Sequence, residues 1–324
     1  MGRHKTNVLK TTIAAVMAAA LGATLSACTS EPEPTPPSKT GSFAIVGDTT
    51  SVLSWDAIKA GAMKAGEDLG VSVVFTAADA KTDQLGLVHQ TMMSKPTGIG
   101  VGVVAGSGSD VADVVGEAQT SGTPAVLYDS PAAGTSLTTV VSNDTWIGQT
   151  AAQQLSVLVN SGKVAVVGNA SDGPAKARSD AFSAYLKANA PRVTMAGTAE
   201  GADRAAASKA TADLLKKNPG LVAIFATDGN STLGVADAVK SAGAKNVKVL
   251  GVDALPDEVK AVKNGTIAGA IAQNPFNIGY QLVTVLAHTA DGTPSPQKTV
   301  YSQAVWYTAA NMKDPAVSTV LNLQ

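Results

Sequence analysis

The sequence predicts an α/β protein made of two lobes, each built on a parallel, doubly wound sheet. The chain has 324 residues, a length that suits two lobes of roughly 120–150 residues each. Apolar residues make up 45% of the chain and charged residues 15%, which fits closely packed layers of helix on sheet. From residue 42 onward, short apolar runs alternate with amphipathic segments. Such alternation is typical of parallel, doubly wound sheets.

Residues 1–27 have the layout of a secretory signal peptide. Arg3, Lys5 and Lys10 precede the apolar run TTIAAVMAAALGATL, which is too short to span a membrane comfortably. The stretch LSAC, Leu25 to Cys28, overlaps the end of this run and resembles the lipobox of bacterial lipoproteins. We therefore expect cleavage before Cys28 and a lipid on its thiol, rather than a buried thiol or an uncleaved anchor. Cys28 is the only cysteine in the chain, so no disulfide can form within it.

A tether and an acidic body are expected after the signal peptide. Residues 28–41 contain TSEPEPTPPSKT, a proline-rich stretch without apolar side chains that predicts an extended linker. Removing residues 1–27 leaves 21 basic and 25 acidic residues, a net charge of −4. No basic stripe is interleaved with aromatic residues, so nucleic acid is not an expected partner. We expect an extracytoplasmic protein, anchored by lipid to the outer face of a membrane.

The first lobe is predicted from four apolar runs separated by amphipathic helices. Strands are expected at 42–48, 71–77, 98–105 and 124–129, and helices at 55–70, 83–94 and 109–122. In the first helix, Trp55, Ile58, Ala62 and Leu69 recur at helical spacing. Pro96 ends the second helix.

The second lobe repeats this architecture without a close sequence repeat. The alternation pauses around 138–148 and then restarts. Strands are expected at 163–170, 192–199, 221–228, 247–253 and 266–273, and helices at 174–191, 203–220, 230–243, 256–265 and 275–292, followed by an apolar run at 298–306. The expected lobes comprise residues 42–143 plus 274–298 and residues 144–273 plus 299–324. Two similar halves imply two sheets with a cleft between them.

Four of the predicted strands finish on an aspartate. FAIVGD ends at Asp48, AVLYD at Asp129, IFATD at Asp228 and VLGVD at Asp253. Ligands of open parallel sheets bind beyond the carboxyl ends of the strands. Each aspartate alone could simply cap the following helix, but four together favour a binding site.

The four carboxylates would repel one another unless something satisfies them. A cation, an arginine or a ligand rich in hydroxyl groups could do so. Arg178, in KARSDAF, is a candidate counter-charge, although the spacing also suits a solvated helix arginine. Trp55 could pack on the C–H face of a sugar, or it could be an ordinary core tryptophan.

Three motifs in the second lobe carry a family resemblance. TDGNSTLGVADAVKSAG, VLGVDALPD and GAIAQNPFNIGYQ resemble the solute-binding proteins of sugar ABC importers, the ribose- and galactose-type periplasmic binding family, and the resemblance extends over about residues 42–312. It implies the type I periplasmic binding protein fold, in which three crossovers join two lobes that close on a monosaccharide. It also implies delivery to a membrane permease, and we expect a monomer. The ligand-binding positions that the resemblance implies are Asp48, Trp55, Asp129, Asp144, Arg178, Asp228, Asp253 and Gln273.

The chain departs from that family at three positions near the expected site. VLSW stands where relatives often carry Asn-Pro-Phe-Phe, Ser130 where an arginine often follows the first-lobe aspartate, and Ala202 where an aromatic residue often precedes Asp-Arg. With an aromatic ring on only one face of the ligand, instead of one ring on each face, a small sugar or a linear polyol becomes as plausible as ribose. A nucleoside, an autoinducer-type furanose or an amino acid stays an alternative ligand.

Other functional classes are less well supported by the sequence. After signal removal only His89 and His288 remain, both within amphipathic helices, and no GxSxG, HExxH or cysteine nucleophile is present. We therefore expect a binding protein with no catalytic residues and no cofactor, and a cleft enzyme acting on sugars stays the less favoured alternative. The four aspartates come from strands too far apart to share one metal ion. A repressor of this fold would need a helix-turn-helix before residue 42, whereas ligand delivery to a chemoreceptor stays compatible with the sequence.

Overall fold

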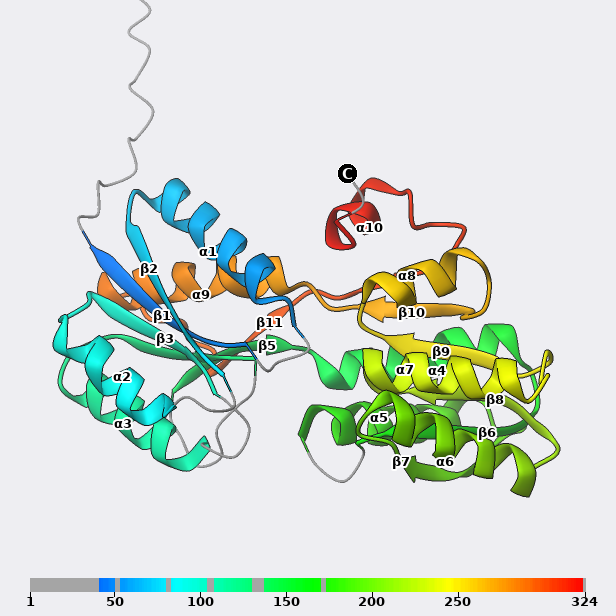
Figure 1. Cartoon of the computed structure of the whole chain (residues 1–324). Helices are drawn as coiled ribbons and strands as arrows, with labels where there is room; N and C mark the ends of the chain where they lie inside the picture. Colours follow the sequence, from blue (N-terminus) through cyan, green and yellow to red (C-terminus); the bar gives the residue numbers. More distant parts are fainter. Residues whose placement is uncertain are drawn as a thin grey trace, which may run out of the picture. The chain divides into compact units, whose positions relative to one another are not determined.

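The structure, a computed structural model, describes residues 41–49, 53–79, 83–103, 108–129, 137–169 and 173–322. The signal peptide, most of the tether and Cys28 lie outside these residues. Within them the chain forms two six-stranded sheets flanked by helices, which confirms the predicted α/β fold of two lobes (Figure 1). None of the helices in the described ranges is both long enough and apolar enough to cross a membrane.

The first sheet is entirely parallel, with strand order β11-β5-β4-β3-β1-β2. Its strands are β1 (Ser42–Asp48), β2 (Ser72–Ala78), β3 (Gly98–Gly102), β4 (Ala125–Tyr128), β5 (Thr138–Ser142) and β11 (Thr299–Ser302), and its helices are α1 (Trp55–Leu69), α2 (Gln84–Met93), α3 (Gly108–Thr120) and α9 (Pro275–Ala290). Alternate residues of β1 serve the two faces, because successive side chains of a strand point to opposite sides. Phe43 and Ile45 pack with α1 and α9, whereas Val46 packs with α2 and α3.

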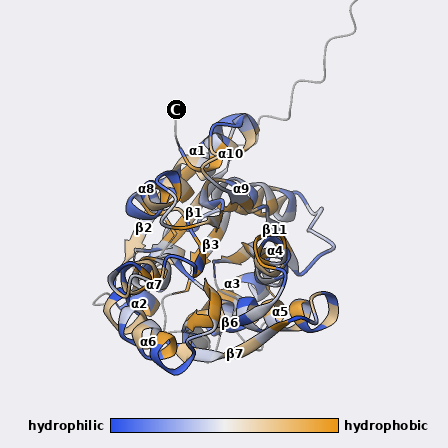
Figure 2. Ribbon diagram, turned by 90° about the vertical axis from the view of Figure 1, so that its right-hand side faces the viewer, coloured by the Kyte–Doolittle hydropathy of each residue, from blue (hydrophilic) through white to orange (hydrophobic). Residues whose placement is uncertain are grey.

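The second sheet has strand order β12-β10-β9-β8-β6-β7, and only β12 runs antiparallel to its neighbour. Its strands are β6 (Gly162–Gly168), β7 (Val193–Glu200), β8 (Leu221–Ala226), β9 (Lys248–Val252), β10 (Gly269–Ala272) and β12 (Val305–Tyr307), and its helices are α4 (Asp144–Leu158), α5 (Gly173–Asn189), α6 (Arg204–Lys217), α7 (Gly229–Ser241), α8 (Pro256–Lys263) and α10 (Pro315–Val320). Figure 2 shows largely hydrophobic strands between helices that alternate hydrophobic and hydrophilic residues. Phe182 of α5 stacks on Phe225 of β8 with ring centroids 4.8 Å apart, which fixes α5 on this sheet.

The pause expected around 138–148 is in fact a strand followed by a helix. β5 extends the first sheet, and α4 begins directly after it. The Asn143 side chain caps α4 by accepting a hydrogen bond from the Trp146 N–H at 3.0 Å. Ile147, Ala151 and Leu155 form the buried stripe of α4, a 3.6-residue pattern that was visible in the sequence.

The strand pairing also differs from the expected division of the chain at residues 299–302. β11 pairs with β5, from Thr299 opposite Thr139 to Ser302 opposite Ser142, so this segment belongs to the first sheet and not to the second lobe. The reason is local, because the preceding helix α9 packs in the first-lobe core and the backbone edge of β5 needs a hydrogen-bonding partner. After residues 303–304 the chain enters the second sheet as β12. The chain thus passes between the two sheets three times.

Candidate ligand-binding site

Arg178 is the centre of a buried polar network in the second lobe. It lies on α5 and is only 5% exposed. Its Nε donates to Asp144 Oδ1 at 2.7 Å, its Nη1 to the Thr227 carbonyl at 2.8 Å and its Nη2 to Gln273 Oε1 at 3.2 Å. Each guanidinium nitrogen therefore has a partner from a different segment, which holds the planar fork in one orientation.

Asp253 is the second member of this network and follows directly after β9. Its Oδ2 accepts a hydrogen bond from the Gly229 N–H at 2.8 Å, and its Oδ1 accepts from the Gln273 side-chain amide. Tyr307 donates its hydroxyl to the Asp253 carbonyl at 3.0 Å. These bonds hold Asp253 in the left-handed region at φ 86°, a conformation that costs free energy and persists because the surroundings fix it.

Burial raises the pKa of both acids in the network. For Asp253, burial is the largest influence, and Arg178, Gln273 and the Gly229 N–H oppose it by lowering the pKa. Burial likewise raises the pKa of Asp144, Arg178 lowers it, and the negative charge of Asp253 raises it further. With both acids ionised, one positive charge faces two negative ones. Hydrogen-bond donors from a ligand would stabilise that ionised state.

A third acid, Glu258, lies behind the network in the first turn of α8. Its side chain is fully buried, and its Oε1 has no hydrogen-bond partner among the described residues. Burial raises the pKa of Glu258 well above its usual range, and the charges of Asp253 and Asp228 raise it further. Burial therefore favours the neutral form of this carboxyl, which would avoid adding a third negative charge beside the site.

Asp228 serves as the N-cap of α7. Its Oδ1 accepts from the Ser231 N–H at 2.9 Å and its Oδ2 from the Ser231 hydroxyl at 2.6 Å. The residues on either side of it belong to the network, because Thr227 accepts from Arg178 and Gly229 donates to Asp253. The capping interpretation is thus observed, and Asp228 also lies next to the network.

In the first lobe, Asp48 and Asp129 lie near the same buried tyrosine. Asp48 ends β1 and Asp129 follows β4, with φ 69°. Between these strand ends, the Tyr128 hydroxyl donates to the Val46 carbonyl at 3.3 Å. Burial raises the pKa of Tyr128 well above its usual value, and the carboxylates of Asp129 and Asp48 add to this effect. The two aspartates therefore share one corner of the first sheet.

Trp55 lies beside that corner and is partly packed against the lobe. It begins α1, and a Cβ atom on Gly47 would lie 2.6 Å from its ring. The ring also meets Phe75 edge to face with centroids 6.0 Å apart. Packing on β1 thus accounts for part of its surface, and its contact with a ligand stays a prediction.

The two histidines of the described residues lie on α2 and α9. His89 and His288 are both exposed. No group of three or more potential metal-ligating side chains is found within the ranges that the structure describes.

Sequence reasoning missed three contributors to the second-lobe network. Two are backbone groups, the Thr227 carbonyl and the Gly229 N–H, and the third is the Tyr307 hydroxyl. Gly229 could have been found, because the first N–H groups of a helix lack internal partners and bind anions. Tyr307 comes from β12, which carried no chemical signal in the sequence.

The position of Arg178 depends on close contact between α4 and α5. A Cβ atom at Gly148 would lie 2.1 Å from the Arg178 carbonyl oxygen. Gly148→Ala should therefore force the helices apart and lower the free energy of unfolding by about 1–3 kcal/mol. Gly116→Ala on α3 is the matched control, because a Cβ atom there meets nothing within 4 Å, and it should stabilise by about 0.5–1 kcal/mol. Equal effects in urea unfolding would contradict the inferred contact.

Comparisons with known proteins agree with this architecture. A family model described as periplasmic binding protein domain matches residues 43–294. The ribose import binding protein of Salmonella typhimurium is 27% identical over 248 residues, covering 75% of this chain and 82% of that protein. The D-allose-binding periplasmic protein of Escherichia coli is 36% identical over 123 residues, which are 36% of this chain and only 39% of that protein.

Solved structures give the same result. An arabinose-binding protein from Geobacillus stearothermophilus has a TM-score of 0.77 at 27% identity, and the match covers 84% of this chain and 98% of that one. A carbohydrate transporter solute-binding protein from Agrobacterium radiobacter, in complex with D-arabinose, has a TM-score of 0.72 at 25% identity and covers 87% and 99% of the two chains. Because the family model spans most of the chain, this protein belongs to the periplasmic binding protein family.

Proposed function

We propose that this chain is the extracytoplasmic substrate-binding protein of an ABC transporter and captures a monosaccharide or a sugar alcohol. The observation that carries the proposal is the buried network of Arg178, Asp144, Gln273 and Asp253 at the carboxyl ends of the second-lobe strands. The named relatives bind ribose, D-allose and arabinose. Their names support a sugar over a nucleoside, a furanose signal or an amino acid.

The chemistry of the network suits a ligand rich in hydroxyl groups. A hydroxyl both donates and accepts, an ionised carboxylate accepts, and the arginine fork donates. Arg178 and Asp253 are each only 5% exposed, so a ligand here would be removed from water. A ligand that lacks one hydroxyl would leave a buried group without a partner, at a cost of about 1–3 kcal/mol. Selectivity for one sugar follows from that cost.

In this proposal the ligand bridges the two lobes. Asp48, Asp129 and Trp55 would supply the first-lobe contacts and the Arg178 network those of the second lobe. A ligand that contacts both lobes stabilises their closed arrangement relative to an open one, and a membrane permease can then recognise the closed form. A micromolar dissociation constant corresponds to about −8 kcal/mol, which such a network can supply without catalysis or a cofactor.

The anchor and the partners are part of the same proposal. Residues 1–27 support export, and Cys28 supports attachment to the outer face of the membrane through a lipid. The protein would act as a monomer that delivers its ligand to the permease. Release of a lipid-free protein by Cys28→Ser would support the anchor, and an unchanged membrane-bound fraction would contradict it.

A thermal-shift screen tests the ligand class. Pentoses, hexoses and sugar alcohols are compared with amino acids and nucleosides on the purified mature protein. A ligand that binds only the folded state stabilises it by about 2.7 kcal/mol at a hundredfold excess over its dissociation constant, so one sugar or polyol should raise the melting temperature by several degrees. A shift of the melting temperature with amino acids or nucleosides alone would exclude a sugar as the ligand, but it would still support a ligand-binding role for the protein.

A further inference from the structure

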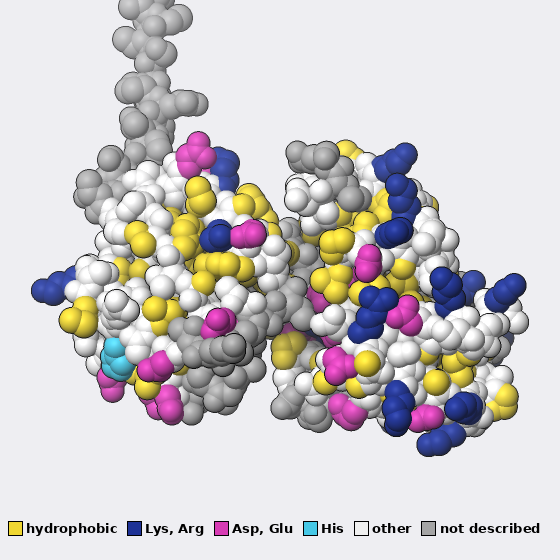
Figure 3. Space-filling view, viewed as in Figure 1, with side chains coloured by type: hydrophobic (Ala, Val, Ile, Leu, Met, Phe, Trp, Pro, Cys, Tyr) yellow, Lys and Arg dark blue, Asp and Glu magenta, His cyan; other side chains and the backbone are white. Residues whose placement is uncertain are grey.

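The basic residues of the second lobe gather at one end of its sheet. This basic end is the edge where the strands begin and the helices finish. It consists of Lys163, Lys187, Arg192, Lys216, Lys217, Lys240, Lys245, Lys248, Lys260 and Lys263. All ten side chains are exposed, and Figure 3 shows basic side chains collected along the right-hand margin of this lobe.

Most acidic residues of the lobe lie at the opposite edge of the sheet or at the helix ends beside it. They are Asp144, Glu200, Asp203, Asp228, Asp253, Asp257 and Glu258. Asp213, the acid nearest the basic end along α6, lies 4.0 Å from Lys209. Charge is therefore separated along the direction of the strands.

Helix dipoles account for only part of this separation. Cations in the last turn of a helix are favourable, and α5, α6, α7 and α8 each carry at least one. The first lobe has the same architecture, yet α1, α2 and α3 carry no basic residue in their last turns. Lys245 and Lys248 lie in a loop and at the start of β9, where no dipole favours them. The basic end is thus specific to the second lobe.

The ten side chains form no ion pairs within the described residues. Lysines elsewhere do form them. Lys59 lies 2.8 Å from Asp56, and Lys64 and Lys176 pair with Asp68 and Asp180. The charge at the basic end is therefore available to an external partner.

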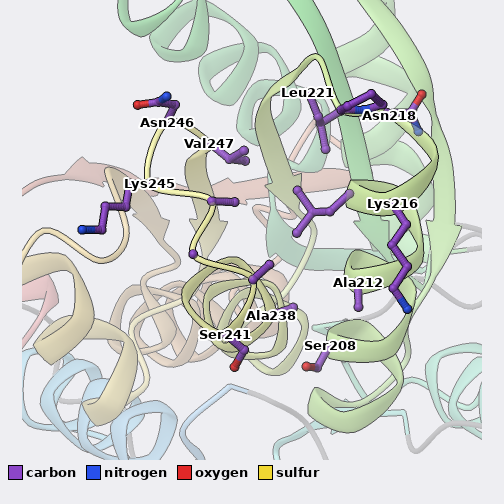
Figure 4. Close-up of a pocket in the computed structure, with 15 residues that line it drawn as sticks. Ser208, Ala212, Lys216, Asn218, Leu221, Ala238, Ser241, Lys245, Asn246 and Val247 are labelled. Atoms are coloured by element: carbon purple, nitrogen blue, oxygen red, sulfur yellow. The ribbon is translucent and has the colours of Figure 1, made fainter.

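Two grooves lie within the basic end. One, of about 880 Å³, runs between the last turns of α6 and α7 and is floored by Leu221 and Val247, with Lys216 and Lys245 at its two sides (Figure 4). The other, of about 360 Å³, lies on the far side of the loop at 243–247 and is bordered by Lys240 and Lys248. Flexible ammonium groups thus surround shallow, partly apolar hollows.

We propose that the basic end docks on a bilayer surface containing anionic phospholipid. Nine of its ten residues are lysines, which are mobile point charges that suit a diffuse anionic surface better than a fixed array of carboxylates. The ends of several helices and strands contribute them, so no single short acidic peptide could reach them all. The interaction is electrostatic and does not involve the sugar network, and it would orient the protein on the membrane.

Vesicle binding tests the proposal. The mature chain from residue 28, carrying Cys28→Ser so that no lipid is attached, is mixed with vesicles of equal phosphatidylglycerol and phosphatidylcholine, and bound protein is measured by cosedimentation. One lysine near an anionic surface contributes about fivefold to binding. The triple variant Lys216→Gln, Lys245→Gln and Lys248→Gln should therefore bind about a hundredfold more weakly. Binding should also fall steeply with salt, because the Debye length shrinks from about 10 Å at 0.1 M to about 3 Å at 1 M.

A second triple variant provides the matched control. Lys59→Gln, Lys64→Gln and Lys176→Gln change the net charge equally at positions outside the basic end, and this variant should bind as the parent does. Thermal unfolding of both variants shows whether each is folded. The proposal is overturned if both triple variants lose vesicle binding to the same extent. It is also overturned if the parent protein binds vesicles of phosphatidylcholine alone as strongly as the anionic vesicles. If the parent protein does not bind anionic vesicles but is retained on a polyglutamate resin, the proposal is overturned in favour of an acidic protein partner.

Discussion

Arg178→Ala is expected to raise the dissociation constant for the sugar by at least about a hundredfold. The truncation removes three hydrogen bonds and leaves Asp144 Oδ1, the Thr227 carbonyl and Gln273 Oε1 without the donor that they share. Removing one partner of a buried ion pair costs about 3–5 kcal/mol, because the remaining charge stays buried. Stability should fall with affinity, so calorimetry is done at a temperature where the variant is shown to be folded.

Arg204→Ala is the matched control for this variant. Arg204 also forms a 2.7 Å ion pair, with Asp237, but its side chain is 47% exposed. Solvent-exposed pairs contribute roughly 0–1 kcal/mol, so this variant should bind sugar as the parent does. Undiminished affinity in Arg178→Ala would show that the network is structural and would remove the main support for the proposed site.

Asp253→Asn is expected to weaken sugar binding by about tenfold to a hundredfold. Asparagine tolerates a positive φ, so the backbone at φ 86° is not strained further. The Gly229 N–H and the Gln273 amide both donate to this carboxylate, and an amide has only one oxygen to receive them. Hydrogen bonds to charged groups are each worth about 1.5–3 kcal/mol, which sets the size of the loss. Calorimetry against Asp257→Asn, an exposed acid in the first turn of α8, supplies the comparison.

The pH profile separates a ligand-binding role of Asp253 from a structural one. Burial raises its pKa, and ligand hydroxyls favour the ionised form, so affinity should fall as the pH falls through the raised pKa. The stability of the ligand-free protein should depend on pH in the opposite direction. The folded state then binds protons more readily than the unfolded state, and stability increases as the pH falls from the raised pKa toward the ordinary value of about 4. Asp253→Asn should flatten the affinity profile, whereas the stability profile should keep the contributions of Asp144 and Glu258, whose pKa values burial also raises.

The sequence predicted the fold because strand and helix periods alternate over most of its length. The aspartates at the strand ends were visible for the same reason, since each follows an uninterrupted apolar run. The pairing of Arg178 with Asp144 joins residues 34 positions apart, and only the family resemblance pointed to both. Backbone groups such as the Thr227 carbonyl carry no signature in a sequence, because every residue has one.

Two elements were misassigned for physical reasons. The pattern over 138–148 was interpreted as a pause because a strand of five residues is followed directly by the first turns of a helix, and each segment alone is too short to show its period. The apolar run at 298–306 was assigned to the second lobe from residue 299 onward, whereas β11 and β12 pair in different sheets. Periodicity describes which side of a strand is buried, and it does not say which sheet the strand joins.

In the site proposed above, the left-handed backbone at Asp129 and Asp253 would limit which residues could replace these aspartates. Most side chains with a branched Cβ would be strained at these two positions, whereas aspartate, asparagine and glycine are accommodated. Only a few residue types could therefore replace aspartate at these two positions. At positions with ordinary backbone conformation, such as Trp55 and Gln273, many residue types fit. Substitutions there could therefore change the preferred ligand most readily.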